Sequence, residues 1–155
     1  MRARSNRGSE RGTSIAEFSV VALFFFMIIF GIIEFGRLLY IHNALTDASR
    51  RGARYAALHQ LNDPCVANAV IYGESHINQT TCAPSGPPLI NGLTSGNIVV
   101  TYQGSFGMNI GTATVKIQNY TFNLSIPLIN RTLTMPAYTT TLPAESAGVI
   151  PPDID

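Results

Sequence analysis

Few residue patterns in this chain of 155 residues are suited to catalysis. Ser75 precedes His76, but adjacent side chains seldom face each other, and no acid is placed to orient the histidine. Gly104, Gly107 and Gly111 have the spacing of a flexible turn, and no strong helix follows them to bind phosphate. The sequence contains no nucleophile elbow, phosphate-binding loop or zinc-protease motif. We therefore expect no catalytic residues, no cofactor and no enzymatic activity.

The two cysteines, Cys65 and Cys82, predict a disulfide bond if this part of the chain lies in an oxidising compartment. Closing a loop of this size stabilises a fold by roughly 3 kcal/mol. The alternative is a pair of unpaired, small core residues. The histidines at 42, 59 and 76 are scattered along the chain, so their spacing predicts no metal site.

Charged residues are scarce, at 12% of the chain, and the net charge is only +1. This balance argues against nucleic-acid binding, which depends on neutralising phosphates. The basic residues are also unevenly placed, with most of them in two groups: Arg2, Arg4, Arg7 and Arg11, and then Arg50, Arg51 and Arg54. A basic end followed by an apolar block indicates a chain inserted in a membrane.

The apolar block runs from Phe18 to Ile33 without a charge, and its helical pattern continues to Ile41, interrupted by Glu34 and Arg37. The uncharged part covers about 24 Å as a helix, slightly less than the roughly 30 Å of a hydrocarbon core. We predict a membrane span over about 18–41. A buried core helix would need a larger protein around it, and no small-residue cleavage site follows the run, as a secretory signal peptide would require.

More Lys and Arg residues precede the span than follow it closely, which places the N-terminal arm in the cytoplasm and the rest of the chain outside. A disulfide on the far side of the membrane agrees with that direction. We predict a single-pass protein of the inner (cytoplasmic) membrane, with the orientation N-in/C-out.

Beyond the membrane the helical pattern continues, and we predict one helix over 13–61 that Pro64 closes. Such a helix is about 70 Å long. Its distal part is rich in small residues, which permit another backbone to approach closely. A domain built from the remaining residues cannot cover the whole rod, so part of it should contact other chains.

Residues 62–142 are rich in Thr and Asn and predict a small antiparallel β domain, followed by a tail at 143–155. The alternation of apolar residues slips by one near Asn119, which predicts a bulge or a tight break. The expected fold is α+β, with a long N-terminal helix and the β domain packed on its distal half. The predicted strands are Ile98–Tyr102, Ala113–Gln118, Tyr120–Ile126 and Thr132–Leu142.

A more specific motif lies just before the apolar run, where Gly12 is followed after four residues by Glu17 and Phe18. This arrangement resembles the processing site of type IV pilin-like precursors. The resemblance implies that a prepilin peptidase removes a basic leader, 1–12, by cutting between Gly12 and Thr13. Glu17 and Phe18 would then contact neighbouring subunits, with Glu17 neutralised by the new amine of Thr13 on another chain. The alternative is that Glu17 only stabilises the positive end of the helix.

Three sequence blocks together resemble the TadE-like family of tight-adherence (Flp) pilus proteins. They are the Glu17-Phe18 pair, the stretch FGIIEFGR at 30–37 and the stretch ASRRGARYA at 48–56. The resemblance is good over the helix and loose over the β domain. It implies a minor pilin or pseudopilin, with a prepilin peptidase, other pilin subunits, an inner-membrane assembly platform and the lipid bilayer as partners. Family members often carry a proline early in the apolar run, where this chain has Leu23, so no kink is expected there.

Glu34 and Arg37 are three positions apart on one helical face, near the outer end of the predicted span. Charges inside a membrane are costly unless they pair or reach the interface. One interpretation is a local ion pair, and the other is a contact between subunits. The competing function is a permanently anchored envelope protein whose β domain binds a ligand or surface without assembling.

Overall fold

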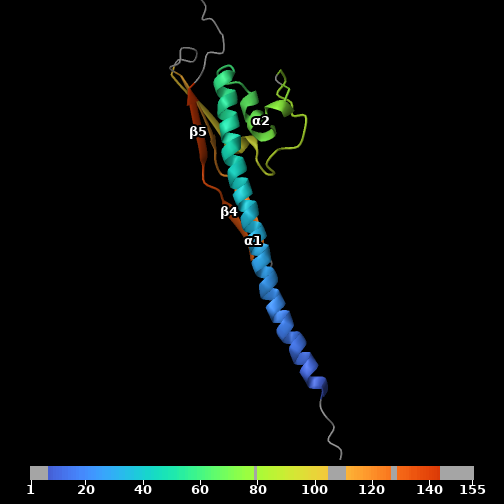
Figure 1. Ribbon diagram of the computed structural model, residues 1–155. Helices are drawn as coiled ribbons and strands as arrows, with labels where there is room; N and C mark the ends of the chain where they lie inside the picture. The colour runs from blue at the N-terminus through green and yellow to red at the C-terminus, as the bar shows by residue number, and fades with distance from the viewer. Residues whose placement is uncertain (1–6, 79, 105–110, 127–128, 144–155) are drawn as a thin grey trace, which may run out of the picture.

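The computed structural model describes residues 7–78, 80–104, 111–126 and 129–143. The first six residues of the predicted leader lie outside them. So does the predicted tail, apart from Pro143. Figure 1 shows one long helix with a small domain gathered around its C-terminal half.

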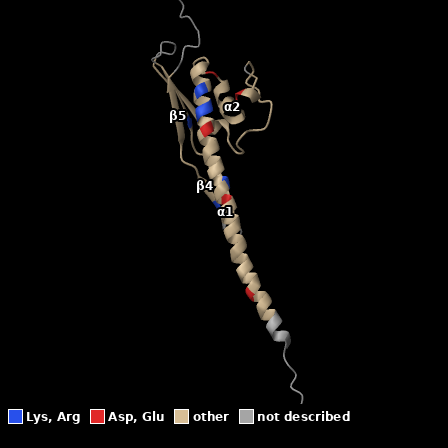
Figure 2. Ribbon diagram, in the orientation of Figure 1, with Lys and Arg blue, Asp and Glu red and all other residues tan. Residues whose placement is uncertain are grey.

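The long helix, α1 (Arg7–Leu58), contains 52 residues. At a rise of about 1.5 Å per residue it is about 78 Å long. The helix begins six residues before the predicted start at 13 and ends three residues before the predicted end at 61. The chain leaves the helix through a turn in which Asn62 has a left-handed backbone with φ of 59°. Between Gly12 and Ile33 only Glu17 is charged, whereas charged residues are more frequent from Glu34 to Leu58 (Figure 2).

A second helix, α2 (Cys65–Tyr72), follows the turn and was not predicted. Pro64 stands at its N-terminal boundary, and the Asp63 side chain accepts a hydrogen bond from the Cys65 amide at 2.7 Å. Proline is tolerated where a helix begins because its missing N–H group would have no partner there. Pro64 therefore stands between two helices, and the prediction that it only closes the first was incomplete.

The strands form two antiparallel sheets instead of the single predicted sheet. One has the order β1-β2-β5, and the other contains β3 and β4. The predicted strand Thr132–Leu142 is wrong, because two strands with a break at Pro136 occupy this region. Two 3-10 turns, Glu74–His76 and Ser95–Asn97, lie in the connections. The strands are β1 (Ile98–Gln103), β2 (Thr112–Ile117), β3 (Thr121–Ile126), β4 (Ile129–Thr134) and β5 (Tyr138–Pro143).

Apart from β1, the strands of the two sheets form one long, bent hairpin. β3 continues the path of β2, and β5 continues the path of β4 (Figure 1). The bend occurs in both arms at the same level, where the Met135 amide donates a hydrogen bond to the Tyr120 carbonyl at 2.8 Å. Asn119 has a φ of 57° in one arm, which is the break that the sequence predicted there, and Pro136 follows Met135 in the other.

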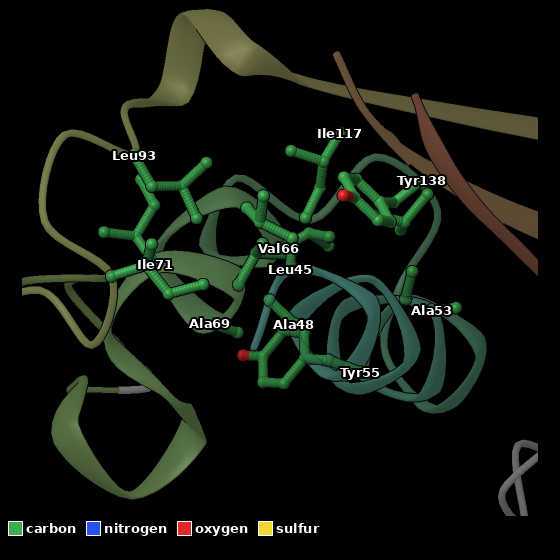
Figure 3. Close-up of a cluster of buried hydrophobic side chains, with 14 of the residues drawn as sticks. Leu45, Ala48, Ala53, Tyr55, Val66, Ala69, Ile71, Leu93, Ile117 and Tyr138 are labelled. Atoms are coloured by element: carbon green, nitrogen blue, oxygen red, sulfur yellow. The ribbon is translucent and has the colours of Figure 1, made fainter. Parts of the chain in front are cut away.

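The hydrophobic core lies between the distal half of α1, α2 and the three-stranded sheet (Figure 3). Leu45, Ala48 and Ala53 of α1 are fully buried, as are Val115 and Ile117 of β2. Polar contacts also tie β5 to the helix, with His42 Nδ1 and the Tyr138 hydroxyl 2.7 Å apart, and the hydroxyls of Ser49 and Thr140 2.9 Å apart. The predicted α+β fold with a β domain on the distal half of the helix is confirmed.

The small residues of α1 allow other elements of the core to pack close to the helix backbone. A Cβ atom added at Gly52 would overlap Cγ2 of Val70 in α2 and would lie 3.2 Å from Cγ1 of Val115 in β2. The close approach that the sequence predicted is thus made by elements of the same chain. Glycine at this position lets the helix, α2 and the sheet meet.

Gly52→Ala should therefore lower the free energy of unfolding by about 1–3 kcal/mol, because the added methyl group overpacks the junction. Gly36→Ala is the matched control, since a Cβ there meets nothing within 4 Å and alanine favours a helix. Thermal unfolding of both variants in the same detergent measures the difference. Equal melting temperatures for the two variants would contradict this packing.

Cys65 and Cys82 form a disulfide bond, with their Cα atoms 4.9 Å apart, and join the start of α2 to the loop that follows it. Reduction should destabilise the domain by roughly 3 kcal/mol through the entropy of the opened loop. Thermal unfolding with and without reductant measures this loss. The double variant Cys65→Ala, Cys82→Ala should begin at the lower stability and show no further response to reductant.

Candidate functional site

The N-terminal half of α1 is an exposed apolar surface. Among residues 12–40 none is buried, and Phe18 is 73% exposed. In the described part of the chain, α1 alone is long and apolar enough to cross a membrane, and none of its most apolar window is buried. The large apolar side chains on this surface include Ile15, Phe18, Val21, Phe24, Phe25, Phe26, Ile28, Ile32, Ile33 and Phe35. Water is a poor environment for so much continuous apolar area, so it requires lipid or another chain.

Glu17 lies within this surface and is exposed. Neither of the two ion pairs found among the described residues involves it. In the intact chain it is well beyond the first turn of α1, which begins at Arg7. The attraction between a carboxylate and a helix N-terminus falls off within that first turn, so the dipole alternative loses support in the uncut chain.

Gly12 and Thr13, the predicted processing site, lie inside α1 and are exposed. Cleavage at an extended backbone would require the helix to open at this point. Glycine makes that opening easier, because it favours a helix by about 1 kcal/mol less than alanine does. A Cβ atom at Gly12 would meet nothing within 4 Å, so packing does not require glycine there.

Glu34 and Arg37 form an ion pair within their own helix, with Arg37 Nη2 and Glu34 Oε2 2.9 Å apart. Only 13% of the Glu34 side chain is exposed, against 48% of the Arg37 side chain. Arg37 also donates a hydrogen bond to the Asn123 carbonyl of β3, and its guanidinium lies 4.5 Å from the centre of the Phe122 ring. The local ion pair is therefore present, together with a contact with β3, and a contact of Glu34 and Arg37 with another subunit stays a prediction.

The base of the β3–β4 hairpin is fixed on its other side by Tyr120. The Tyr120 hydroxyl donates a hydrogen bond to the Asn91 carbonyl at 2.7 Å. Burial raises the pKa of this phenol above its ordinary value of 10.0, although the positive charge of Arg37 acts in the opposite direction. The phenol therefore stays protonated and keeps donating near neutral pH.

The contact between Arg37 and β3 was not predicted from the sequence. The alternation of Phe122, Leu124 and Ile126 placed these side chains on one face of a strand. Nothing local in the sequence connected that face with a residue of α1 so far away along the chain. The contact depends on the bend at Asn119, which directs β3 along the helix.

The disulfide lies close to the Asp63 carboxylate, whose oxygen and the two sulfur atoms are within 4.8 Å of one another. Because the sulfur atoms are bonded to each other, they offer no pair of thiolates to a metal ion. The amide of Asn68 donates a hydrogen bond to the Cys82 carbonyl at 2.7 Å. This cluster fixes the loop against α2.

The second basic group lies on the distal half of α1. Arg51 pairs with Asp47 one turn earlier, whereas Arg50 and Arg54 are exposed. Exposed helical ion pairs of this kind contribute only a few tenths of a kcal/mol. The group is a polar face of the helix opposite its packed side.

An apolar helix that is exposed along its first half and packed against an antiparallel β domain along its second half fits a single-pass membrane anchor. Residues 12–54 match the family model described as TadE-like protein. The predicted resemblance is thereby confirmed for this segment, which includes the exposed surface, the Glu34–Arg37 pair and the start of the packed half. The match lies entirely within α1 and does not extend over the β domain. No curated protein and no solved structure matches the chain.

Arg37→Ala should loosen the β3–β4 hairpin without unfolding the three-stranded sheet. Hydrogen bonds to charged groups contribute about 1.5–3 kcal/mol, so amide hydrogen exchange over 121–126 should become at least about tenfold faster. Exchange in β2 should stay unchanged, and Arg50→Ala, which removes an exposed arginine from the same helix, should leave both regions unchanged. Equal acceleration in β2 and β3 would show that Arg37 stabilises the whole domain instead.

Proposed function

We propose that this chain is a minor pilin or pseudopilin, a structural subunit for assembly of a tight-adherence (Flp-type) pilus, without enzymatic activity. The observation that carries the proposal is the exposed apolar half of α1. The same uninterrupted helix continues into the core of the β domain with its other half. One surface can then contact lipid before assembly and the helices of neighbouring subunits afterwards.

The free energy available from this surface is large. Burying one large apolar side chain contributes about 1.5–3 kcal/mol when the alternative is exposure to water. In lipid that difference is absent, so helices associate through close packing and polar contacts. Outside the bilayer the alternative to burial is again contact with water, so burial of these side chains between subunits is favourable there. The apolar half of α1 therefore supports both anchoring and assembly.

Glu17 provides specificity in this proposal. A carboxylate inside a bundle of apolar helices is strongly destabilising unless a cation compensates it. Cleavage after Gly12 creates an amine at Thr13, four residues before Glu17, and the amine of one subunit can compensate the carboxylate of the next. Phe18 lies beside Glu17 in sequence and is exposed for packing at the same contact.

The proposal implies several partners. A prepilin peptidase removes the basic leader on the cytoplasmic side, and an inner-membrane platform inserts the processed subunit among other pilin subunits. Before that step the chain is anchored in the inner membrane, with its N-terminus inside and its β domain outside. The disulfide between Cys65 and Cys82 supports this direction, because such bonds persist in oxidising compartments.

The N-terminus of the native protein tests the proposal. Mass spectrometry of protein from membranes and from sheared surface filaments should identify a mature chain that begins at Thr13 and is present in the filaments. An arginine-rich N-terminus confined to the membrane fraction would overturn processing. It would favour a permanently anchored protein whose β domain binds a ligand or surface.

Glu17→Gln should insert into the membrane normally but be depleted from filaments by at least about tenfold, since an unpaired partner in an apolar interface costs about 3–5 kcal/mol. Glu74→Gln, at an exposed acid of the β domain, is the control and should enter filaments normally. Quantitative mass spectrometry of both fractions measures the ratio. Normal incorporation of Glu17→Gln would remove Glu17 from the subunit contact.

A further inference from the structure

The β3–β4 hairpin extends from the domain along α1 toward the apolar half of the helix (Figure 1). Arg37 marks its level, because the Arg37 side chain contacts Phe122 and the Asn123 carbonyl. From Asn123, β3 continues for three residues to Ile126, which is about 10 Å at the rise of a β-strand. The end of the hairpin therefore lies beside the helix at or below the Glu34–Arg37 pair.

One face of the hairpin is only partly covered. Phe122, Leu124 and Ile126 alternate on the face of β3 that packs toward the helix, and they are buried or half-buried. Their partners across the hairpin include Leu133, opposite Phe122, and Arg131, opposite Leu124. Side chains directly opposite each other in a sheet share a face. Leu133 is nevertheless 43% exposed and Arg131 is exposed, so the helix covers the β3 side of this face and leaves the β4 side open.

The length of the apolar helix indicates what meets this open side. From Thr13 to Glu34 the helix covers about 32 Å, close to the roughly 30 Å of a hydrocarbon core. If the bilayer occupies that segment, Glu34 and Arg37 lie among the outer headgroups. The hairpin, held at Arg37, then begins at this depth, with Arg131 opposite Leu124, and its end at Ile126 reaches the boundary with the acyl chains.

We propose that the β3–β4 hairpin is a membrane-contact element at the outer lipid headgroups, with Arg131 binding lipid phosphates and Ile126, nearer the end of the hairpin, meeting the acyl-chain boundary. The outer end of the membrane span is then near Glu34 and not at Ile41. This inference rests on the proposed membrane anchorage of α1 but not on processing or assembly.

The chemistry of the hairpin suits that depth. Arg131 takes part in neither of the two ion pairs found among the described residues, and an arginine can bind phosphate oxygens with two parallel hydrogen bonds. The two-stranded sheet also leaves backbone groups without a strand partner at its edges. Headgroups and their water can bond to those groups, whereas hydrocarbon cannot, so the hairpin should rest at the interface and not deeper.

Because the native chain contains no tryptophan, single tryptophans can report depth in vesicles of phosphatidylethanolamine and phosphatidylglycerol. The full chain would carry Asn130→Trp at an exposed position of β4, Phe25→Trp in the apolar half of α1, or Thr101→Trp at an exposed position of β1. Quenching by lipids that carry a spin label either near the headgroup or deep in the acyl chain measures each position. Circular dichroism checks that each variant folds.

The Asn130→Trp chain should be quenched more strongly by the headgroup label than by the deep label. The Phe25→Trp chain should show the opposite preference, and the Thr101→Trp chain should be quenched by neither. Adding Arg131→Gln to the Asn130→Trp chain should lower the ratio of docked to undocked hairpin about fivefold in the anionic vesicles. In vesicles without phosphatidylglycerol this second substitution should have little effect.

Quenching of the Phe25→Trp chain without quenching of the Asn130→Trp chain would overturn the hairpin inference while keeping the anchor. Failure to quench the Phe25→Trp chain would instead overturn the membrane anchorage of the proposed function. A hairpin covered by a second copy would give a third result. The Asn130→Trp chain would then be shielded from a soluble quencher only at high protein density, with no response to labelled lipid, and this result would also overturn the inference.

Discussion

The structure depends on one helix meeting two different environments. Along its distal half, α1 is buried by its own chain, where Gly52 and several alanines allow α2 and β2 to approach the helix backbone. Along its other half, large apolar side chains are exposed and need a cover from outside the chain. The change occurs around Arg37, which pairs with Glu34 within the helix and holds β3 against it. The position of the β3–β4 hairpin and the extent of the exposed apolar surface both follow from this division.

Much of the architecture was predictable because it is recorded in local patterns. The uncharged run from Phe18 to Ile33 predicted an apolar helix surface, and alternation in the distal region predicted three of the five strands closely. The strand predicted at 132–142 was wrong because the β-branched composition continues across the break, so that only Pro136 marked it. The helix α2 was missed because it has eight residues and follows a proline that was interpreted as an end signal.

The candidate site was predictable in its residues but not in its contacts. Gly12, Thr13 and Glu17 were found from their spacing, and the structure places all three on the exposed helix. For Glu34 and Arg37 the sequence left a local pair and a subunit contact open. The structure adds β3 as a neighbour of Arg37, and β3 reaches it only because both arms of the long hairpin bend at the same level, near Asn119 and Pro136. A bend that two distant segments share does not change the hydrophobic periodicity of either segment, so the sequence pattern does not predict it.

The continuity of α1 has a mechanical consequence. No proline or π-type irregularity interrupts the helix between Arg7 and Leu58, so the membrane segment and the β domain share one unbroken series of backbone hydrogen bonds. Torque or tension applied to the domain is therefore transmitted to the apolar segment without an intervening hinge. The rotational setting of the apolar half also determines the direction in which the β domain faces. A molecule that fixes the apolar half of α1 therefore also fixes the orientation of the β domain.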